Sequence, residues 1–151
     1  MRQTLFMIAL FAAVACSQPD PAAHASEPKL APESPVKRCM NLGGSLEAPN
    51  EGEWGYTVRA EDLKRIADAG FDTVRLPVKW SAHADTKPPY TIAPAFMARV
   101  VEIAEQAEDA GLQIIIDVHH YNALMEKPDA HRPRLAAIWR QISDAFAGAP
   151  D

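Results

Sequence analysis

The amino-acid sequence predicts an α/β fold in which helices alternate with parallel strands. The segments DAGFDTV (68–74) and DAGLQII (109–115) repeat at a spacing of 41 residues. Each segment follows a stretch with the apolar periodicity of a helix and leads into a run of residues suited to a strand. A third helical pattern lies near the end of the sequence. Helix–strand units repeated at this length are typical of βαβ connections, whose strands run parallel.

The first two expected strands enclose one helix. Residues 38–42 predict a short strand, and residues 59–69 predict a helix that ends at Gly70, because glycine readily adopts the left-handed conformation after a last helical turn. The apolar stripe of this helix consists of Leu63, Ile66 and Ala67. Residues 71–78 follow as the second strand, with Thr73, Val74 and Leu76 suited to a sheet.

Two longer helices flank the third expected strand. Residues 94–110 predict a helix that begins at Pro94 and ends before Gly111. Its apolar stripe consists of Met97, Val100, Val101, Ala104 and Ala107. Residues 113–118 predict a strand whose apolar run lacks alternation, so we expect it to be buried on both faces. Residues 132–147 predict the last helix, which presents Leu135, Ile138, Trp139, Ile142 and Phe146.

Two parallel architectures fit this order, a doubly wound sheet and a (β/α)8 barrel. A dinucleotide-binding doubly wound sheet would favour a G-x-G-x-x-G turn after its first strand, whereas NLGGSLEAPNEG (41–52) stands there. A barrel carries its chemistry on the loops after its strands, and the unusual polar and aromatic residues fall in those places. A complete barrel needs about 250 residues. Residues 38–151 are therefore expected to form the N-terminal part of a barrel, with about three βα units.

The start of the chain predicts export. Arg2 precedes an apolar run from Leu5 to Ala15, which predicts a secretory signal and is short for a membrane span. Residues 13–16, AVAC, resemble a bacterial lipobox. This resemblance implies that residues 1–16 form the signal and that Cys16 is lipidated, which would anchor the chain to a membrane of the cell envelope. Ordinary signal cleavage with secretion, in which Cys16 is incidental, is the alternative.

The next segment predicts a tether rather than a domain. Residues 17–37 are rich in proline, alanine and serine and hold few large apolar side chains, so they cannot bury a core. If Cys16 is lipidated, Cys39 has no partner for a disulfide, and its apolar surroundings predict a small core residue. The formal net charge of −5 gives no basic footprint for nucleic acid, so no nucleic-acid partner is expected.

The stretch IIIDVHHY (114–121) joins an apolar strand to a cluster of chemically active side chains. Because side chains alternate along a strand, Asp117 and His119 are expected on one face. At the rim of a barrel His119 would hydrogen-bond a ligand, while His120 and Tyr121 would line a groove. The alternative for His120 is a helix cap or contact with solvent.

A metal site is the competing interpretation of the same stretch. Asp117 and His119 could supply two ligands, which leaves a metal-dependent barrel hydrolase open as an alternative. No third ligand stands at a recognisable spacing, because His83 and His131 fall in expected loops. We therefore predict neither a metal nor another cofactor.

Arg75 stands in the middle of an expected strand, in VRLPVKW (74–80). A charge in that setting is costly unless a carboxylate pairs with it. We expect Arg75 to face a functional carboxylate, whose pKa its charge would lower. A purely structural ion pair is the alternative.

Three aromatic residues, Trp54, Trp80 and Tyr90, fall in expected loops. Exposed aromatic faces suit sugar rings, whose axial hydrogens form apolar patches, and loop packing is the alternative. Trp139 lies on a helix stripe instead and is expected in the core.

Together these segments resemble glycoside hydrolase family 5, the cellulase-like retaining glycosidases built on a (β/α)8 barrel. The matching pieces cover nearly all of residues 38–151 and read MNLGGSLEAPNEGEWG (40–55), GFDTVRLPVKW (70–80), PYTIAPAFMARVVEIAEQAEDAGLQIIIDVHHY (89–121) and HRPRLAAIWRQISDAFAGAPD (131–151). Gly44 departs from the asparagine that many members have. The resemblance implies an endo-β-glucanase or cellulase-like O-glycosyl hydrolase, with a β-glucan or related polysaccharide as its partner.

The resemblance also implies roles for individual residues. Arg75 matches the arginine that orients the nucleophile, and His119 matches the histidine that binds sugar at the cleaved site. The residues expected to shape the sugar-binding side of the cleft are Asn41, Glu47, Trp80, His120 and Tyr121.

The two glutamates that perform the family's chemistry match nothing in this sequence. The acid/base follows the fourth strand in an Asn-Glu-Pro motif, and the nucleophile follows the seventh strand. We therefore expect a chain that stops short of both, with no activity alone. The alternative is a non-catalytic surface lipoprotein that binds sugars, with its half-barrel stabilised by dimerisation.

Overall fold

The computed structural model describes residues 36–148. The expected signal, Cys16 and residues 17–35 of the expected tether lie outside the described residues. The elements are, in chain order, β1 (Cys39–Asn41), α1 (Ala60–Asp68), β2 (Thr73–Val78), α2 (Trp80–His83), α3 (Pro94–Asp109), β3 (Gln113–Val118), α4 (Asn122–Glu126) and α5 (Pro128–Ala145). The predicted order of strands and long helices is confirmed. Two short helices, α2 and α4, were not predicted, and α5 begins four residues earlier than expected.

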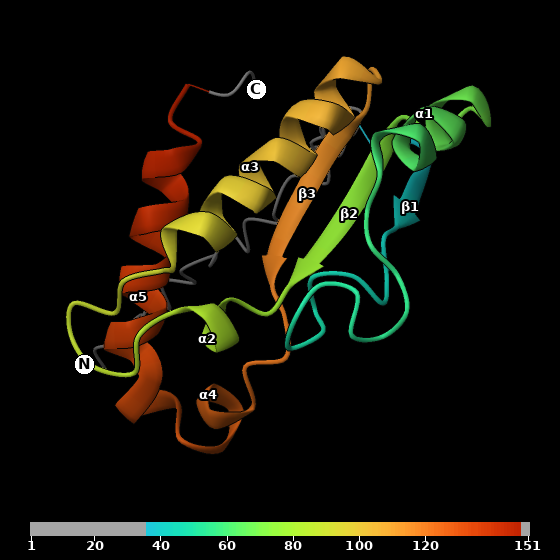
Figure 1. Ribbon diagram of the computed structural model, residues 1–151. Coiled ribbons are helices and arrows are strands. Elements are labelled where there is room, and N and C mark those ends of the chain that lie inside the picture. The colour runs from blue at the N-terminus through green and yellow to red at the C-terminus, as the bar shows by residue number, and fades with distance from the viewer. Residues whose placement is uncertain (1–35, 149–151) are drawn as a thin grey trace, which may run out of the picture. The chain divides into compact units, whose positions relative to one another are not determined.

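The three strands form one parallel sheet in the order β1-β2-β3 (Figure 1). Cys39 of β1 pairs with Thr73 of β2, which in turn pairs with Gln113 of β3. All three strands therefore run toward the same edge of the sheet. The predicted fold class, in which helices alternate with parallel strands, is confirmed.

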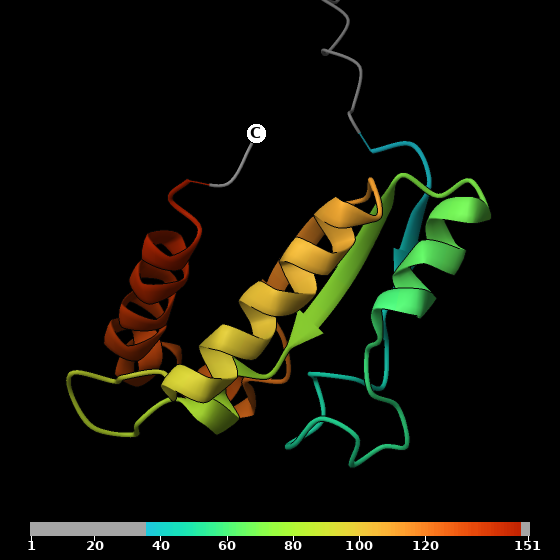
Figure 2. The ribbon, with the colours of Figure 1, turned by 45° about the horizontal axis from the view of Figure 1, so that its top comes forward.

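One face of the sheet packs against helices and forms the core. Val74, Leu76 and Val78 of β2 are fully buried. They share one core cluster with Leu63 of α1 and with Val100, Ile103 and Ala107 of α3. Figure 2 shows α1 and α3 side by side over the sheet. Burying each such aliphatic side chain contributes roughly 1.5–3 kcal/mol, so this face supplies most of the apolar driving force for folding.

The ends of the two sheet-covering helices follow the sequence signals. Gly70 and Gly111 adopt φ of +82° and +76°, each directly after the C-cap residue of its helix, Ala69 and Ala110. A side chain at Gly70 would also meet Arg38, whose Nη1 lies 2.9 Å from an added Cβ. Pro94 occupies the first turn of α3, as predicted.

The opposite face of the sheet is less covered than expected. Ile114 and Ile116 pack against the core, but Ile115 points the other way and is 40% exposed. The prediction that this strand is buried on both faces is therefore wrong for the described residues. Cys39 lies on the same open face and is exposed, so it is not the core residue that was predicted.

Trp139 is a further correction on α5. Its indole is 40% exposed, because Ile138 and Ile142 occupy the buried positions of this helix. None of the helices within residues 36–148 combines the length and the apolar character needed to cross a membrane.

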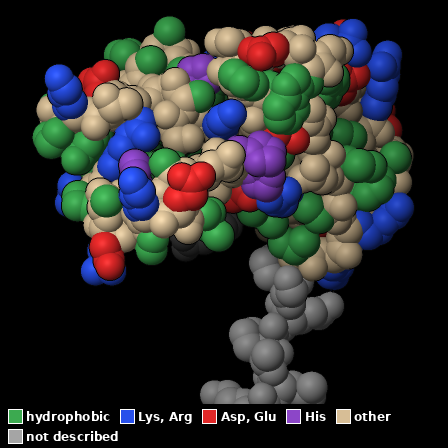
Figure 3. Space-filling view, turned by 90° about the horizontal axis from the view of Figure 1, so that it is seen from below, with side chains coloured by type: hydrophobic (Ala, Val, Ile, Leu, Met, Phe, Trp, Pro, Cys, Tyr) green, Lys and Arg blue, Asp and Glu red, His purple; other side chains and the backbone are tan. Residues whose placement is uncertain are grey.

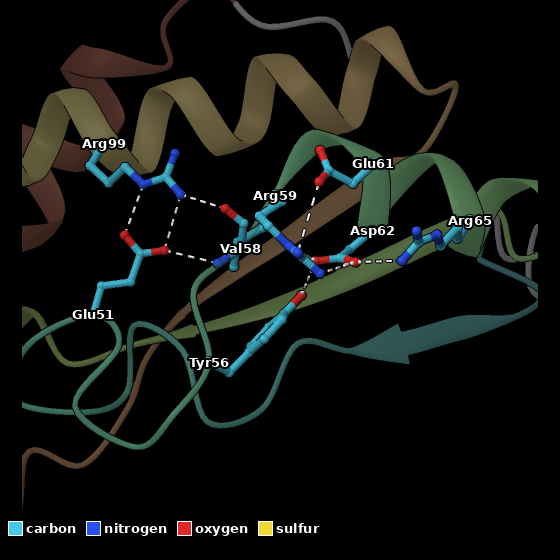
Figure 4. A network of polar contacts seen from close by, with 8 residues as sticks. All are labelled: Glu51, Tyr56, Val58, Arg59, Glu61, Asp62, Arg65 and Arg99. Atoms are coloured by element: carbon cyan, nitrogen blue, oxygen red, sulfur yellow. Dashed lines mark hydrogen bonds and ion pairs between the residues drawn. The ribbon is translucent and has the colours of Figure 1, made fainter.

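An ion pair fastens the long connection between β1 and α1 to helix α3. Arg99 donates from Nε and Nη2 to the two carboxylate oxygens of Glu51 at 2.8 and 3.0 Å, and Nη2 also donates to the Val58 carbonyl (Figure 4). Glu51 also accepts the Val58 N–H at 3.0 Å. Burial raises the pKa of Glu51, but the hydrogen bonds from Arg99 and from the Val58 N–H outweigh it, so the pKa lies below its usual range.

Replacing Arg99 with methionine is expected to lower the free energy of unfolding by roughly 1–3 kcal/mol, because Glu51 loses its charged hydrogen-bond donor in a half-buried place. Urea denaturation followed by circular dichroism measures the change. The matched control is Arg65→Met, since Arg65 is 73% exposed in its pair with Asp62. That control should cost less than about 0.5 kcal/mol. Equal losses in the two variants would contradict a special role for the Glu51–Arg99 pair.

His83 joins α2 to α3 in a half-buried place. Its ring stacks on Phe96 with centroids 3.6 Å apart and planes 9° apart, and Trp80 meets the same phenyl ring edge-on at 5.7 Å. Its Nε2 is buried without a partner among the described residues. Burial lowers the pKa of His83 below 6.5, and the nearby Lys79 charge adds to that effect, while the Pro49 carbonyl opposes it.

Stability should therefore fall in mildly acidic solution. The unfolded chain takes up a proton on His83 near pH 6.5, whereas the folded chain resists it, so this contribution is complete above that pH and declines below it. Free energies of unfolding at about pH 7.5 and about pH 5.5 should differ in the unaltered chain and differ less in His83→Phe. The control His120→Asn, at an exposed histidine, should keep the full difference. An unchanged pH dependence in His83→Phe would show that another group titrates.

Candidate active site

Polar side chains gather where the strands end, on the face of the sheet opposite α1 and α3. The register pairs Asn41 with Arg75 and Pro77 with Asp117, which places Asn41, Arg75 and Asp117 on one face. His119 follows Asp117 by two residues and lies on the same side. Figure 3 looks onto this end of the molecule and shows histidine side chains gathered between acidic and basic ones.

Arg75 is the centre of this cluster. Its Nη2 forms an ion pair with Asp117 Oδ2, and its Nη1 donates to Asn41 Oδ1 at 2.7 Å. Arg75 and Asp117 are only about one-third exposed at the side chain, at 34% and 30%. Asp117 Oδ1 is buried and has no hydrogen-bond partner among the described residues. Within the described residues Arg75 thus faces Asp117, which agrees with the alternative of a structural ion pair, and the functional carboxylate expected for Arg75 stays a prediction.

His119 is oriented by the same pair. Its Nδ1 lies 3.3 Å from Arg75 Nη2 and 3.5 Å from Asp117 Oδ2. Since Nδ1 is turned toward the ion pair, Nε2 is the ring nitrogen left for a ligand. The face-sharing of Asp117 and His119 predicted from strand alternation is confirmed by this contact.

Glu47 enters the site from the loop after β1. It is 9% exposed, and its Oε1 accepts the Gly44 N–H at 2.8 Å. Its Oε2 is buried without a partner among the described residues. Gly43 lets this carboxylate and Asn41 come close, because an added Cβ there would lie 3.0 Å from Asn41 Nδ2 and 3.6 Å from Glu47 Oε1.

Trp80 does not present its ring to a ligand. It is fully buried at the start of α2, and its Nε1 donates to the Asp117 carbonyl at 3.0 Å. The prediction that it lies in a loop and helps to form the cleft wall is wrong for the described residues. Its indole instead fixes the backbone of β3 at Asp117, the residue that forms the ion pair with Arg75.

Tyr121 is also buried, at 6% exposure, and its hydroxyl contacts two side chains of α5. Its hydroxyl lies 2.9 Å from His131 Nδ1 and accepts a hydrogen bond from Arg134 Nη1 at 3.3 Å. Arg134 is 7% exposed and donates to the carbonyls of Ser81, Ala84 and Asp85. Sequence reasoning missed Arg134, whose carbonyl acceptors lie 49 to 53 residues earlier in the chain. It also placed His131 in a loop rather than in α5.

His120 remains at the surface of the site. It is exposed, adopts φ of +51°, and meets His119 edge-on with ring centroids 4.4 Å apart. Within residues 36–148, no group of three or more histidine, cysteine, aspartate or glutamate side chains is arranged to hold a metal ion.

Residues 35–151 match the model of the family Cellulase (glycosyl hydrolase family 5). The match spans all three strands and every site residue described above. The chain belongs to glycoside hydrolase family 5. The resemblance on which the sequence prediction rested is thereby confirmed.

Curated relatives are cellulases and endoglucanases. The chain is 35% identical over 122 residues to "Cellulase/esterase CelE" of Acetivibrio thermocellus, covering 77% of this chain and 15% of that protein. It is 34% identical over 156 residues to "Endoglucanase B" of Paenibacillus lautus, covering 95% of this chain and 27% of that protein. This family 5 chain therefore spans about a quarter or less of the length of these two relatives.

Solved structures show the same fold. Cel5A of Thermotoga maritima in complex with mannotriose has a TM-score of 0.75 and 43% identity, over 76% of this chain and 37% of that chain. An endo-β-1,4-glucanase of family 5 subfamily 4 from Bacillus licheniformis, complexed with cellotetraose, has a TM-score of 0.71 and 31% identity, over 76% of this chain and 24% of that chain. The three βα units thus correspond to part of the family 5 barrel.

Replacing Asp117 with asparagine is expected to destabilise the chain by roughly 1.5–3 kcal/mol, because the Arg75 charge loses its ionised partner. Urea denaturation measures the loss. A double-mutant cycle with Arg75→Met is the control. Asp117→Asn should lower the free energy of unfolding far less in the Arg75→Met variant, because that variant has no guanidinium to pair with Asp117. Strictly additive losses would show that the two side chains do not interact energetically.

Proposed function

We propose that this chain carries the sugar-binding half of the active site of a retaining endo-β-glucanase. The observation that supports the proposal most directly is the Arg75–Asp117–His119 cluster at the strand ends, in a chain of family 5. In (β/α)8 enzymes chemistry resides at that end of the barrel. The related endoglucanases make a β-linked glucan the favoured substrate class.

Retaining hydrolysis requires two carboxylates about 5–5.5 Å apart, one as acid/base and one as nucleophile. Neither Asp117 nor Glu47 takes those roles in this proposal. Neither residue stands where the family's two glutamates stand, because Asp117 lies at the end of the third strand and Glu47 follows the first. The two glutamates would come from the ends of a fourth and a seventh strand, beyond the three strands described.

Arg75 would position the nucleophile. A guanidinium has more N–H donors than the acceptors that Asn41 and Asp117 offer here. A further carboxylate at this edge could therefore be bound and kept ionised. His119 would use Nε2 to bind the sugar at the cleaved bond.

The remaining predicted residues would bind or shape the sugar-binding side. Asn41 and His120 are exposed at the site, whereas Glu47 is buried and would shape the cleft through its hydrogen bond to the Gly44 N–H. Tyr121 would act through its backbone and ring position, because its hydroxyl is engaged by His131 and Arg134. Export through residues 1–16, lipidation at Cys16 and a tether over residues 17–37 belong to the same proposal.

The first experiment is to read the coding sequence downstream of the Asp151 codon. The proposal expects an in-frame fourth strand ending in Asn-Glu-Pro and a second glutamate farther on. In the protein with a complete barrel, Arg75→Lys should lower kcat on soluble β-1,4-glucan by about 10²- to 10³-fold, the loss typical of one electrostatic donor. Arg65→Lys, at an exposed arginine of α1, is the matched control and should leave kcat unchanged.

A binding-only protein would give a different result. Isothermal titration calorimetry would then detect β-glucan oligosaccharides, whereas reducing-sugar assays on the complete protein would detect no hydrolysis. That combination would overturn the enzymatic proposal in favour of a non-catalytic sugar-binding surface protein.

A further inference from the structure

The ring of His119 lies against a group that can only donate hydrogen bonds. Arg75 Nη2 lies 3.3 Å from His119 Nδ1 and also pairs with Asp117 Oδ2. A guanidinium has N–H donors and no acceptor. Nη2 carries two of those N–H groups, so one can point to Asp117 while the other points to His119. Nδ1 can accept from that second N–H only if it is the unprotonated nitrogen of a neutral imidazole.

A hydrogen bond from His119 to Asp117 is the competing arrangement. His119 Nδ1 lies 3.5 Å from Asp117 Oδ2, which is longer than the usual range of roughly 2.7–3.2 Å for an N–H···O hydrogen bond. That oxygen also accepts from Arg75 already. A proton on Nδ1 would place two donors face to face, because Arg75 Nη2 is the nearer of the two neighbours. The geometry therefore favours Nδ1 as the acceptor of a hydrogen bond from Arg75.

The backbone and a neighbouring ring hold His119 in this orientation. Trp80 Nε1 donates to the Asp117 carbonyl at 3.0 Å, and the His119 N–H donates to the Val78 carbonyl at 2.8 Å. The His120 ring meets the His119 ring edge-on, with centroids 4.4 Å apart. A half-turn of the His119 imidazole would point a ring C–H at the guanidinium and leave its N–H without this acceptor. The observed orientation satisfies both groups.

We propose that Arg75 fixes His119 as the neutral tautomer with its proton on Nε2, and that Asp117 is the positioning residue that holds the guanidinium for this contact. His119 then meets a ligand as a hydrogen-bond donor and not as an acceptor. The inference rests on the proposed function for the identity of that ligand, whose accepting atom would be an oxygen of the glycan.

This tautomer bears on the metal site that the sequence left open. A protonated Nε2 has no lone pair with which to bind a metal ion or to take a proton from water. A metal ion at Nε2 would require the proton to move to Nδ1, where it would face the Arg75 cation. The geometry therefore argues against His119 and Asp117 as a pair of metal ligands, and it assigns Asp117 to Arg75 instead.

Nuclear magnetic resonance reads the tautomer directly, because long-range ¹H–¹⁵N correlations distinguish a protonated from an unprotonated ring nitrogen. The full chain would be labelled with ¹⁵N-histidine and measured without ligand at about pH 8, where histidine is neutral. Loss of one set of signals in His119→Gln assigns the ring. The Nε2–H form should exceed the Nδ1–H form by about tenfold or more, the ratio that one charge-assisted hydrogen bond supplies.

Substitutions of Arg75 and Asp117 test the cause of this preference. Arg75→Met should reverse it, because Nδ1–H can then donate to Asp117. Arg75→Gln keeps a polar side chain in the strand and should give an intermediate ratio, which serves where the methionine variant does not fold. Asp117→Asn keeps the guanidinium and should leave the proton on Nε2 at a reduced ratio. Circular dichroism establishes that each variant is folded.

These measurements use neither glycan nor hydrolysis, so they are independent of the test of the proposed function. A dominant Nδ1–H form in the unaltered chain, or an unchanged ratio in the folded Arg75 variants, would overturn the fixed tautomer and leave the proposed function standing. An unchanged ratio in Asp117→Asn would remove Asp117 from the positioning role. A coding sequence without the two glutamates would overturn the proposed function and leave the tautomer of His119 as it is.

Discussion

Arg75 carries a positive charge in the middle of a strand whose other residues are all buried. That charge is tolerable only because the neighbouring strands supply Asn41 on one side and Asp117 on the other. The register of the sheet is what brings them together. A slip of one residue between β2 and β3 would turn Asp117 to the face that holds Leu76 and Val78, where a carboxylate would be buried against apolar side chains.

Much of the surrounding structure fixes the ends of these strands. The Trp80 Nε1–H donates to the Asp117 carbonyl at 3.0 Å, and the His119 N–H donates to the Val78 carbonyl at 2.8 Å. Arg99 fastens the loop that carries Glu47 and Trp54, while Arg134 joins α5 to the turn after α2 and to Tyr121. These supports come from three different helices. Binding groups held by rigid neighbours need little reordering when a ligand arrives, which favours affinity.

The sequence allowed the strands, the long helices and the shared face of Asp117 and His119 to be predicted, because each depends on local periodicity. The sequence did not allow the burial of a side chain to be predicted where that burial depends on which helices cover a face of the sheet. Cys39 and Ile115 look like core residues by composition, yet the strand register places them on the face opposite the core cluster. Trp80 looked like a loop aromatic, yet it is fully buried, because its indole N–H finds an acceptor 37 residues later in the chain.

The side chains of β2 show how one strand serves stability and chemistry at once. Leu76 and Val78 point to the helices and belong to the core, whereas Arg75 points to the opposite face and belongs to the site. Along that opposite face the polar side chains of the cluster, Arg75, Asp117 and His119, lie toward the carboxyl ends of the strands. The amino-terminal half of the same face holds Cys39 and Gln113, which have no part in the cluster. Because neighbouring residues of one strand face different environments, substitutions on the site face can alter ligand binding while the helix-packed face keeps its apolar contacts. This arrangement requires one charged residue, Arg75, inside a buried strand. The ion pair with Asp117 makes that charge compatible with folding.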